Sequence, residues 1–471
     1  MAIFKPWNYG ETFLIQPDPK EWLPEYHEAY FVAELIIKLA HDTPVPLRDP
    51  EIGGRPAFNP MMMLIVMVFA YLRGVRSSRK INRLLIENIA FKILACDQKP
   101  NFRTLCRFRA FHSAWFEKML TRTIHVGMVL RIIDFSAVIV DGTPIQASAN
   151  QGKSLTLEGL TKVREEELLD LAAARAKAMM AEAAEIDAKE DQVLGDDIGP
   201  NSMLKGLTSE RLGRLDDAIA KAKALEMLRL RKEGEARAAI LRKAVPGKKA
   251  RKRVKGTRGR KLSKEERRSL LSRLSKIRVP KHPKVNYTDP DSLTLKAKNG
   301  GFNQAYQVVR ATELHSGMIL VNHLSPSGGE SRELPAVVEK TLEVTGMPEL
   351  LRVLADKGYS GEPNLKQVKG VFQLLIAQKV NAKSPLVKTQ IKLNNRKRYW
   401  MKKRGIGEGS NAGTKEARGF RRFFLRRRGG VAIELMLDAI AHNLMKLRSK
   451  ISKLTEPKLS KALINAAMCG A

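Results

Sequence analysis

The stretch that decides the fold is Ala137-Val138-Ile139-Val140-Asp141-Gly142-Thr143, an apolar run that leads into an acid. Such a run predicts a β-strand that ends at Asp141. A second segment of the same kind, Leu351-Arg352-Val353-Leu354-Ala355-Asp356, lies far downstream and also ends in an aspartate. We therefore expect one sheet in which two strands each carry an aspartate at their end.

A third acid, Glu408, lies in Arg404-Gly405-Ile406-Gly407-Glu408-Gly409. Three carboxylates in these settings predict a divalent-metal site. Each has an alternative interpretation. Asp141 before Gly142 also suits a turn, and Asp356 suits a helix cap, although the strand before each favours the site. The glycines around Glu408 are poor helix formers, and Glu434 in the last predicted helix competes with it as the third ligand.

The charge of the chain indicates its kind of partner. The 471 residues carry a net charge of +35 and have a pI near 10.2, which implies a polyanion, either nucleic acid or an anionic membrane surface. The membrane interpretation is weak because the longest apolar run, Met61 to Leu72, is shorter than the ~20 residues of a spanning helix. A metal-binding acidic centre in so basic a protein predicts chemistry on nucleic-acid phosphodiesters.

The cysteines and the N-terminal residues indicate the cellular compartment of the protein. The three cysteines form no CxxC pair, so neither a zinc finger nor a disulfide framework is indicated. The N-terminus has no signal-peptide core. We expect a soluble protein of a reducing compartment.

Residues 55–125 are predicted to be helical. Pro60 suits a helix start, and the run Met61 to Leu72 is apolar all round, so that helix should be buried. Short helices joined by tight turns and rich in arginine suit a helix-turn-helix-like DNA reader. The alternative is a plain helical bundle with solvated arginines. The arginines concerned are Arg76, Arg79, Arg83, Arg103, Arg107 and Arg109.

A long insertion follows the first strand. Residues 160–193 and 208–244 are rich in Ala, Leu, Glu, Lys and Arg, with a break at 195–201, and predict a helical hairpin or coiled coil. From 242 to 261 there are eleven Lys or Arg and no acid, which predicts an arm that clamps DNA phosphates rather than a solubilising tail. This run includes Lys248, Lys249, Arg251, Lys252 and Arg253.

Alternating strands and helices resume after the insertion. Strands are predicted at 293–295, 305–310, 318–321, 351–355 and 371–376, with helices at 333–344 and 431–448. This order predicts an α/β fold, a mixed sheet with helices packed on it. From 392 to 428 there are fourteen Lys or Arg and only two acids, Glu408 and Glu416.

These motifs give the chain its resemblance to a known family. Taken in order, it resembles the DDE transposases of bacterial insertion sequences over most of its length. The matching segments are Gly54-Arg55-Pro56, Ser77-Ser78-Arg79 and Arg107-Phe108-Arg109 in the helical leader; Asp141-Gly142-Thr143-Pro144-Ile145; 286–292 followed by 300–306; Ala355-Asp356-Lys357-Gly358-Tyr359; and Glu408-Gly409, Gly413, Lys415, 419–423 and His442-Asn443-Leu444.

The resemblance implies a ribonuclease-H-like sheet whose acids, here Asp141, Asp356 and Glu408, hold two Mg²⁺ ions, with Mn²⁺ as a substitute. Mg²⁺ suits hard oxygen ligands, and a pair of ions can activate the attacking oxygen and stabilise the leaving one. The family pattern places an arginine four residues before the glutamate and a lysine seven after it. Arg404 and Lys415 match, and are implied to bind phosphates, whereas the expected tyrosine is Met401 with Tyr399 nearby. Arg421 and Arg422 extend this basic surface.

The expected domains are a helical DNA-binding domain at 1–125, a catalytic domain at 130–155 and 285–450, a helical and basic insertion at 156–284, and a tail at 451–471. The implied function is metal-dependent cleavage at the terminal inverted repeats and strand transfer into target DNA, by at least a homodimer on DNA. The implied location is the bacterial cytoplasm, at the nucleoid. The alternatives are a ribonuclease-H-like nuclease without strand transfer and an inactive DNA-binding derivative.

Overall fold

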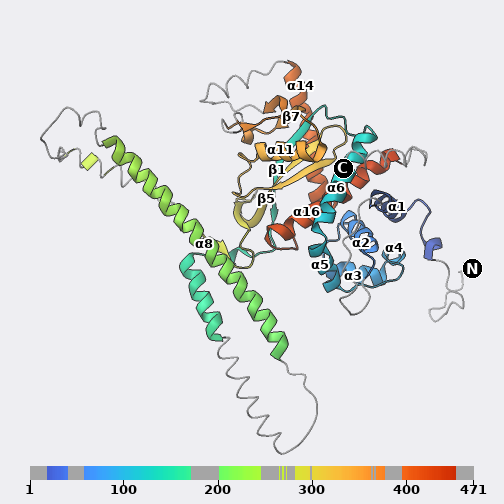
Figure 1. Ribbon diagram of the computed structural model, residues 1–471, viewed down its shortest axis with the longest axis horizontal. Coiled ribbons are helices and arrows are strands. Elements are labelled where there is room, and N and C mark those ends of the chain that lie inside the picture. Colours follow the sequence, from blue (N-terminus) through green and yellow to red (C-terminus); the bar gives the residue numbers. More distant parts are fainter. Residues whose placement is uncertain are drawn as a thin grey trace, which may run out of the picture. The chain divides into compact units, whose positions relative to one another are not determined.

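The structure, a computed structural model, describes residues 19–40, 58–170, 201–244, 265, 268–269, 272, 282–297, 300–361, 364, 367–376 and 395–451. Within these ranges the side chains of 19–20, 201–210, 237–244, 395–397, 406–408, 410 and 449–451 are not described. The chain divides into two compact units (Figure 1). The first comprises residues 1–148 and 305–471, and the second comprises residues 149–304.

The first unit begins with helices. These are α1 (Glu28–Ala40), α2 (Pro60–Leu72), α3 (Ser78–Glu87), α4 (Ile89–Leu94), α5 (Phe102–Phe111) and α6 (Ser113–Val129). The predicted start of α2 is confirmed: Pro60 is its first residue, and the Asn59 side chain accepts hydrogen bonds from the backbone N–H groups of Met61 and Met62. Residues 62–71 of this helix are all buried, as an all-apolar helix requires.

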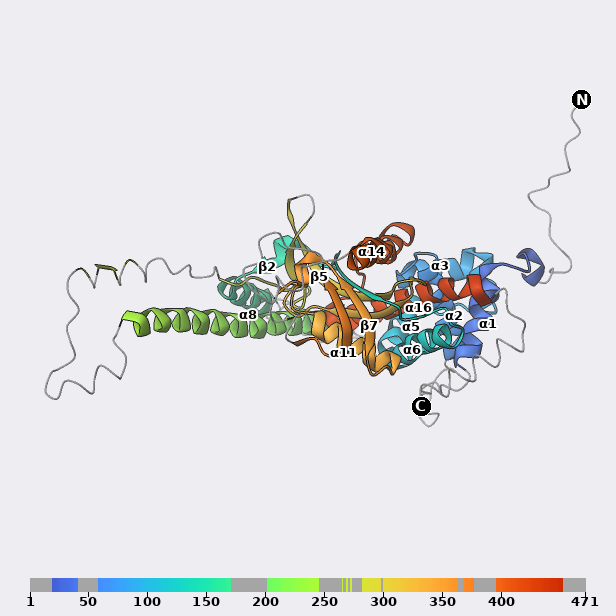
Figure 2. The same cartoon turned by 90° about the horizontal axis from the view of Figure 1, so that it is seen from above.

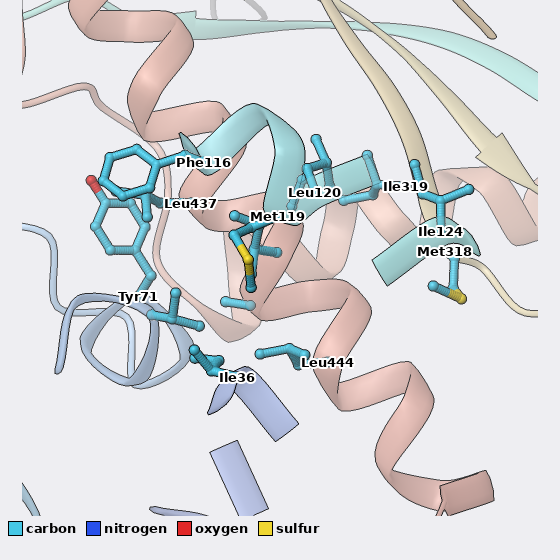
Figure 3. Packing of buried hydrophobic residues seen from close by; sticks show 14 of the residues in the cluster. Ile36, Tyr71, Phe116, Met119, Leu120, Ile124, Met318, Ile319, Leu437 and Leu444 are labelled. Carbon is cyan, nitrogen blue, oxygen red and sulfur yellow. The ribbon is translucent and has the colours of Figure 1, made fainter. Parts of the chain in front are cut away.

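These helices pack in the same unit as most strands of the main sheet. The last helix, α16 (Arg427–Ile451), contacts α6 and α2. Tyr71, Phe116, Met119, Leu437 and Leu444 belong to one buried cluster (Figure 3). The N-terminal helices therefore share a hydrophobic core with the C-terminal part of the chain.

The sheet is mixed. Its strands are β1 (Val138–Gln146), β4 (Leu293–Lys296), β5 (Phe302–Glu313), β6 (Ile319–Leu324), β7 (Leu350–Ala355) and β8 (Val371–Ile376). The order is β4-β5-β1-β7-β8, with β6 also paired to β5. β1 is antiparallel to β5 and parallel to β7, and β7 is parallel to β8. This mixed sheet is consistent with the expected ribonuclease-H-like catalytic domain.

Helices cover both faces of this sheet (Figures 1 and 2). On one face, Val138 and Val140 of β1 share a core with residues of α16 and of α11 (Leu334–Thr345). On the other face, Ile139 packs in a cluster with Trp400 and Met401 of α14 (Asn395–Lys403). β1 is thus buried on both sides up to the residue before Asp141.

The first strand is longer than the sequence predicted. The expectation that it ends at Asp141 is wrong, because β1 stays paired with β5 as far as Gln146. The pairing with β7, by contrast, stops at Val140. Asp141 is therefore the first β1 residue beyond the parallel neighbour.

The second unit contains a long helix, α8 (Asn201–Ala244), and a small two-stranded sheet of β2 (Ser154–Leu155) and β3 (Val285–Asn286). The helical residues 157–170 pack on α8, where Leu160 joins Leu215, Ile219 and Ala222 in a buried cluster. Ion pairs Arg164–Asp216 and Arg211–Glu167 flank the contact. The expected helical character is seen here, whereas residues 171–200 and the basic residues Lys248, Lys249, Arg251, Lys252 and Arg253 lie outside the described residues.

Candidate metal centre and its surroundings

Asp141 and Asp356 come together through strand register. Val140 of β1 pairs with Ala355 of β7, and each aspartate is the next residue along its own strand. Parallel neighbours lie about 4.8 Å apart, so the two carboxylates start from adjacent backbone positions. Asp356 also caps the short 3-10 turn Lys357–Tyr359, which leads the chain away from the sheet.

The third acid lies on a helix packed against the first strand. Glu408 falls within α15 (Gly405–Ala412), which contacts β1, so the chain is helical there despite its glycines. The side chain of Glu408 lies outside the described residues. One turn later, Asn411 donates a hydrogen bond from Nδ2 to Asp141 Oδ2 at 2.9 Å. Residues three apart share a helix face, so the backbone of α15 presents position 408 on the side that faces β1.

Two expected phosphate-binding residues border the acids. Arg404 Nη1 lies 3.4 Å from Asp356 Oδ1, and Lys415 Nζ donates a hydrogen bond to the backbone oxygen of Pro144 in β1 at 2.9 Å. Both therefore flank the strand ends that carry the aspartates.

A buried ionic network anchors the segment that follows α15. Arg310, which pairs with Asp141 across β1 and β5, donates from Nη1 to Thr414 Oγ1 at 2.8 Å. Thr414 in turn donates to Asp438 Oδ2, and Arg418 Nε donates to Asp438 Oδ1 at 2.8 Å. Burial lowers the pKa of Arg310 to about 10, still well above neutral pH, so the network keeps its charge and ties α15 to the sheet and α16.

Glu330 is a further acid near Asp141 that no sequence pattern indicated. Its Oε2 accepts a hydrogen bond from Gln307 Nε2 at 3.2 Å. A Cβ atom on Gly142 would collide with Glu330 Oε2, and a Cβ on Gly358 would lie 3.2 Å from Glu330 Oε1. The Glu330 carboxylate thus lies against the glycine after Asp141 and near the turn after Asp356. Glu330 lies in the loop that follows β6, where the sequence contains no recognisable motif. The glycines of Asp141-Gly142 and Asp356-Lys357-Gly358 are the sequence signal that another group could approach closely there.

The acids affect one another. Burial is the main cause that raises the pKa of Asp141, opposed by the Asn411 hydrogen bond. Burial, followed by the charges of Asp141 and Asp356, raises the pKa of Glu330. Burial and the charges of Glu330, Asp141 and Asp356 raise the pKa of Tyr359, whose buried hydroxyl has no hydrogen-bond partner among the described residues. Clustered acids of this kind favour a bound cation, because it relieves their mutual repulsion.

Glu434, the alternative third ligand, has a different setting. It is fully buried in α16, and its Oε1 accepts hydrogen bonds from the backbone N–H groups of Phe424 and Leu425. Burial raises its pKa to about 7, and the charges of Arg109 and Arg76 oppose this rise. These contacts give Glu434 a structural role at the junction between the N-terminal helices and α16.

The arginines expected to contact DNA divide into two groups. Arg76 and Arg109 are buried, at 7% and 2% exposure. The Arg76 guanidinium lies 4.1 Å from the ring centroid of Phe420 and donates to the Gly419 oxygen, while Arg109 donates to the Arg76 oxygen and to Tyr71. The prediction of a DNA-facing position is wrong for these two, because their guanidinium groups hold the helices to the C-terminal segment. The exposed ones are Arg79, Arg83, Arg103, Arg107, Arg421 and Arg422.

Another group with metal-ligand residue types lies before β1. The ligand atoms of Asp134, Glu313 and His315 lie within 4.8 Å of one another, and His315 Nδ1 is 2.8 Å from Asp134 Oδ2. Glu313 pairs with Val138, so this group is at the opposite end of β1 from Gln146 and is separate from Asp141. None of the helices in the described ranges combines the length and apolar character needed to cross a membrane.

Comparison with known proteins identifies the family. Residues 18–110 match the family model described as "Transposase domain (DUF772)", and residues 275–444 match the one described as "Transposase DDE domain". No curated protein and no solved structure matches the chain. The two matches occur in the expected order and include Asp356, Glu408 and the C-terminal block, and together with the mixed sheet they show that the chain belongs to the DDE transposases of insertion sequences.

Proposed function

We propose that the protein cleaves DNA at the terminal inverted repeats of its own element and joins the freed ends to target DNA. The observation that carries this proposal is the register of β1 and β7, which places Asp141 and Asp356 side by side. The helix with Glu408 packs on the same strand. Three carboxylates from two strands and a helix are thereby available to one centre.

The donor set fits a hard divalent cation. Asp141, Asp356 and Glu408 would hold Mg²⁺, for which carboxylate oxygens are suitable ligands, and Mn²⁺ would substitute. The side chain that binds Asp141 also carries a buried amide oxygen, Asn411 Oδ1, which has no partner within the described part of the chain. When bound, the metal would supply Lewis-acid activation of the attacking and leaving oxygens.

The reaction has two displacements at phosphorus. In the first, a water oxygen bonds to the phosphorus at the element end, the P–O3′ bond breaks, and the leaving 3′-oxygen takes up a proton. In the second, that 3′-hydroxyl bonds to a target phosphorus and displaces the target's own 3′-oxygen. Arg404 and Lys415 flank the aspartates and would bind the phosphates beside the scissile bond, so that they orient the strand.

The DNA surface of the first unit would consist of the exposed arginines Arg79, Arg107, Arg421 and Arg422. Such contacts neutralise phosphates and release counterions, so affinity should fall steeply with salt, with a slope of about −0.9 per contact. The basic run at 242–261 would add to this surface. Because two element ends must be cut together, we propose that a homodimer acts on DNA.

The test is Mg²⁺-dependent cleavage of a duplex that carries the element's terminal repeat. Wild type is compared with Glu408→Gln, Glu434→Gln and, as matched control, Glu416→Gln, an exposed acid paired with Arg421. We expect cleavage to be lost only with Glu408→Gln, when rates are normalised to folded protein. Loss of cleavage only with Glu434→Gln would instead identify Glu434 of α16 as the third ligand.

The joining step separates the alternatives. Incubation of cut ends with a target plasmid should give covalent end-to-target products. Cut ends that never join would indicate a ribonuclease-H-like nuclease. Repeat-specific binding without any cleavage would indicate an inactive DNA-binding derivative.

A further inference from the structure

Asn411 joins the two halves of the acidic centre. It lies on α15, one turn after Glu408, and its Nδ2 donates to Oδ2 of Asp141, which is 270 residues away in the chain. Only 8% of Asn411 is exposed. The bond therefore links the helix of the third acid to the strand of the first inside the protein.

The chemistry of the pair fixes the direction of this bond. An ionised carboxylate only accepts hydrogen bonds, so the amide nitrogen must face it. The bond occupies Oδ2 of Asp141 and holds the carboxylate in one rotamer, because α15 is itself packed on β1. The other oxygen, Oδ1, is thereby turned in a fixed direction.

The second observation concerns the rest of the amide. Among the residues that the structure describes, Asn411 Oδ1 is buried and has no hydrogen-bond partner. A buried amide oxygen is nearly always satisfied, and an orphan is most often explained by a water, an ion or a ligand. Since the same amide binds Asp141, this oxygen lies beside the carboxylate where the cation would be held.

We propose that Asn411 is a positioning residue of the metal centre: Nδ2 orients Asp141, and Oδ1 accepts a hydrogen bond from a water molecule held there with the cation. This inference rests on the proposed function, because it assumes that Asp141 is a metal ligand. Outer partners that orient a ligating carboxylate typically change metal affinity or activity by roughly 10–100-fold when they are removed.

The identity of the residue matters as well as its size. Alanine at 411 removes both the donor and the orphan oxygen. Aspartate keeps the shape but replaces the donor by a second acceptor, which faces Asp141 Oδ2 with a like charge. Serine keeps a small polar group that is too short to span the same distance.

The experiment measures Mn²⁺ binding to the full-length protein by electron paramagnetic resonance, without DNA. The variants are Asn411→Ala, Asn411→Ser and Asn411→Asp. Asp141→Asn serves as the loss control, and Ala412→Ser, at the exposed neighbouring position, serves as the matched control on the same helix. Circular dichroism and thermal unfolding verify that each variant is folded.

We expect Asn411→Ala and Asn411→Ser to weaken Mn²⁺ binding by about 10–100-fold, while Ala412→Ser binds as wild type does. DNA affinity should be unchanged, and a high Mn²⁺ concentration should restore part of the cleavage by Asn411→Ala. A merely structural role would not show this rescue. Should one variant fail to fold, the other still tests the inference.

Two outcomes separate the inference from the function beneath it. If wild type binds Mn²⁺, Asp141→Asn does not, and the folded Asn411 variants bind as wild type does, the role of Asn411 is refuted and the metal centre stands. If wild type binds no Mn²⁺, or Asp141→Asn binds it unchanged, the proposed metal centre itself fails and the inference fails with it.

Discussion

Acids occupy two contrasting places in the first unit. Near the end of β7, Asp141, Asp356 and Glu330 lie near one another, and burial, followed by the charges of Asp141 and Asp356, raises the pKa of Glu330. At the helix junction, Glu434 lies near Arg109 and Arg76, and its Oε1 accepts hydrogen bonds from two backbone N–H groups. The first place leaves repulsion for a cation to relieve, whereas arginines and backbone donors of the protein itself oppose the effect of burial in the second.

Burial alone therefore does not identify a functional acid. Glu434 is more deeply buried than Asp141 and has the more strongly shifted pKa, yet its partners are those of a structural joint. Perturbed pKa values cluster at functional sites, but structural charge networks perturb pKa values as well, so the groups around each acid must be compared.

The largest effect is expected when an aspartate of the metal centre is replaced. Asp141→Asn and Asp356→Asn each remove a charged ligand, so the rate of DNA cleavage should fall by at least about 1,000-fold, as for groups that act as a unit. DNA affinity, measured by fluorescence anisotropy, should stay nearly unchanged, because phosphate contacts come from the basic surface. Equal loss of binding would show that the aspartates are structural.

The next largest effect is expected at the buried contacts around Glu434. Arg109→Ala removes a buried cation beside Glu434 and leaves Tyr71 and the Arg76 oxygen without their donor. Breaking a buried charged contact costs about 3–5 kcal/mol, measurable by urea unfolding. Arg107→Ala, two residues away and exposed, should instead leave stability nearly unchanged and lower the salt slope of DNA binding by about 0.9. Similar stability losses in Arg109→Ala and Arg107→Ala would contradict the division of the arginines into a buried and an exposed group.

A smaller effect concerns the pH dependence of stability. The folded pKa of Glu434, about 7, lies above the ordinary value of 4.5, so the folded state holds its proton more tightly than the unfolded state. The contribution of this group is present below pH 4.5 and is lost as pH rises through 7, by up to about 3 kcal/mol. Glu434→Gln, which stays neutral, should lack this loss in urea unfolding measured from pH 4.5 to 8. Parallel wild-type and variant curves would refute the raised pKa.

The smallest effect probes the space beside Asp141. A methyl group in Gly142→Ala would collide with Glu330, and overpacking costs about 1–3 kcal/mol. Thermal unfolding should show the loss, and cleavage should fall because β1 shifts under Asp141. Gly234→Ala is the matched control: this exposed position in α8 has nothing within 4 Å of the added carbon, so stability should rise slightly through helix propensity. If the stability and the cleavage rate of Gly142→Ala equal those of wild type, Glu330 does not lie against Gly142.

Local patterns predicted much of the fold. β8 was predicted with its observed bounds, and β7 and α11 within about one residue, because apolar runs and helical spacing are local signals. The end of β1 was not predicted correctly: Asp141-Gly142 has the chemistry of a turn, but pairing with β5 extends the strand to Gln146. The exposure of arginines was also beyond reach, since Arg107 and Arg109 lie in one motif and differ only in the face of α5 that they occupy.

The sequence by itself determined which residues could form a metal centre in a basic protein, Asp141 and Asp356 above all, because each follows an apolar strand. Only the tertiary structure decided that Glu330 and Asn411 approach Asp141, and that Arg76 and Arg109 join Glu434 inside the molecule. The physical reason is distance along the chain. Strand propensity and charge are properties of neighbouring residues, whereas contacts across 270 residues depend on strand register and helix packing.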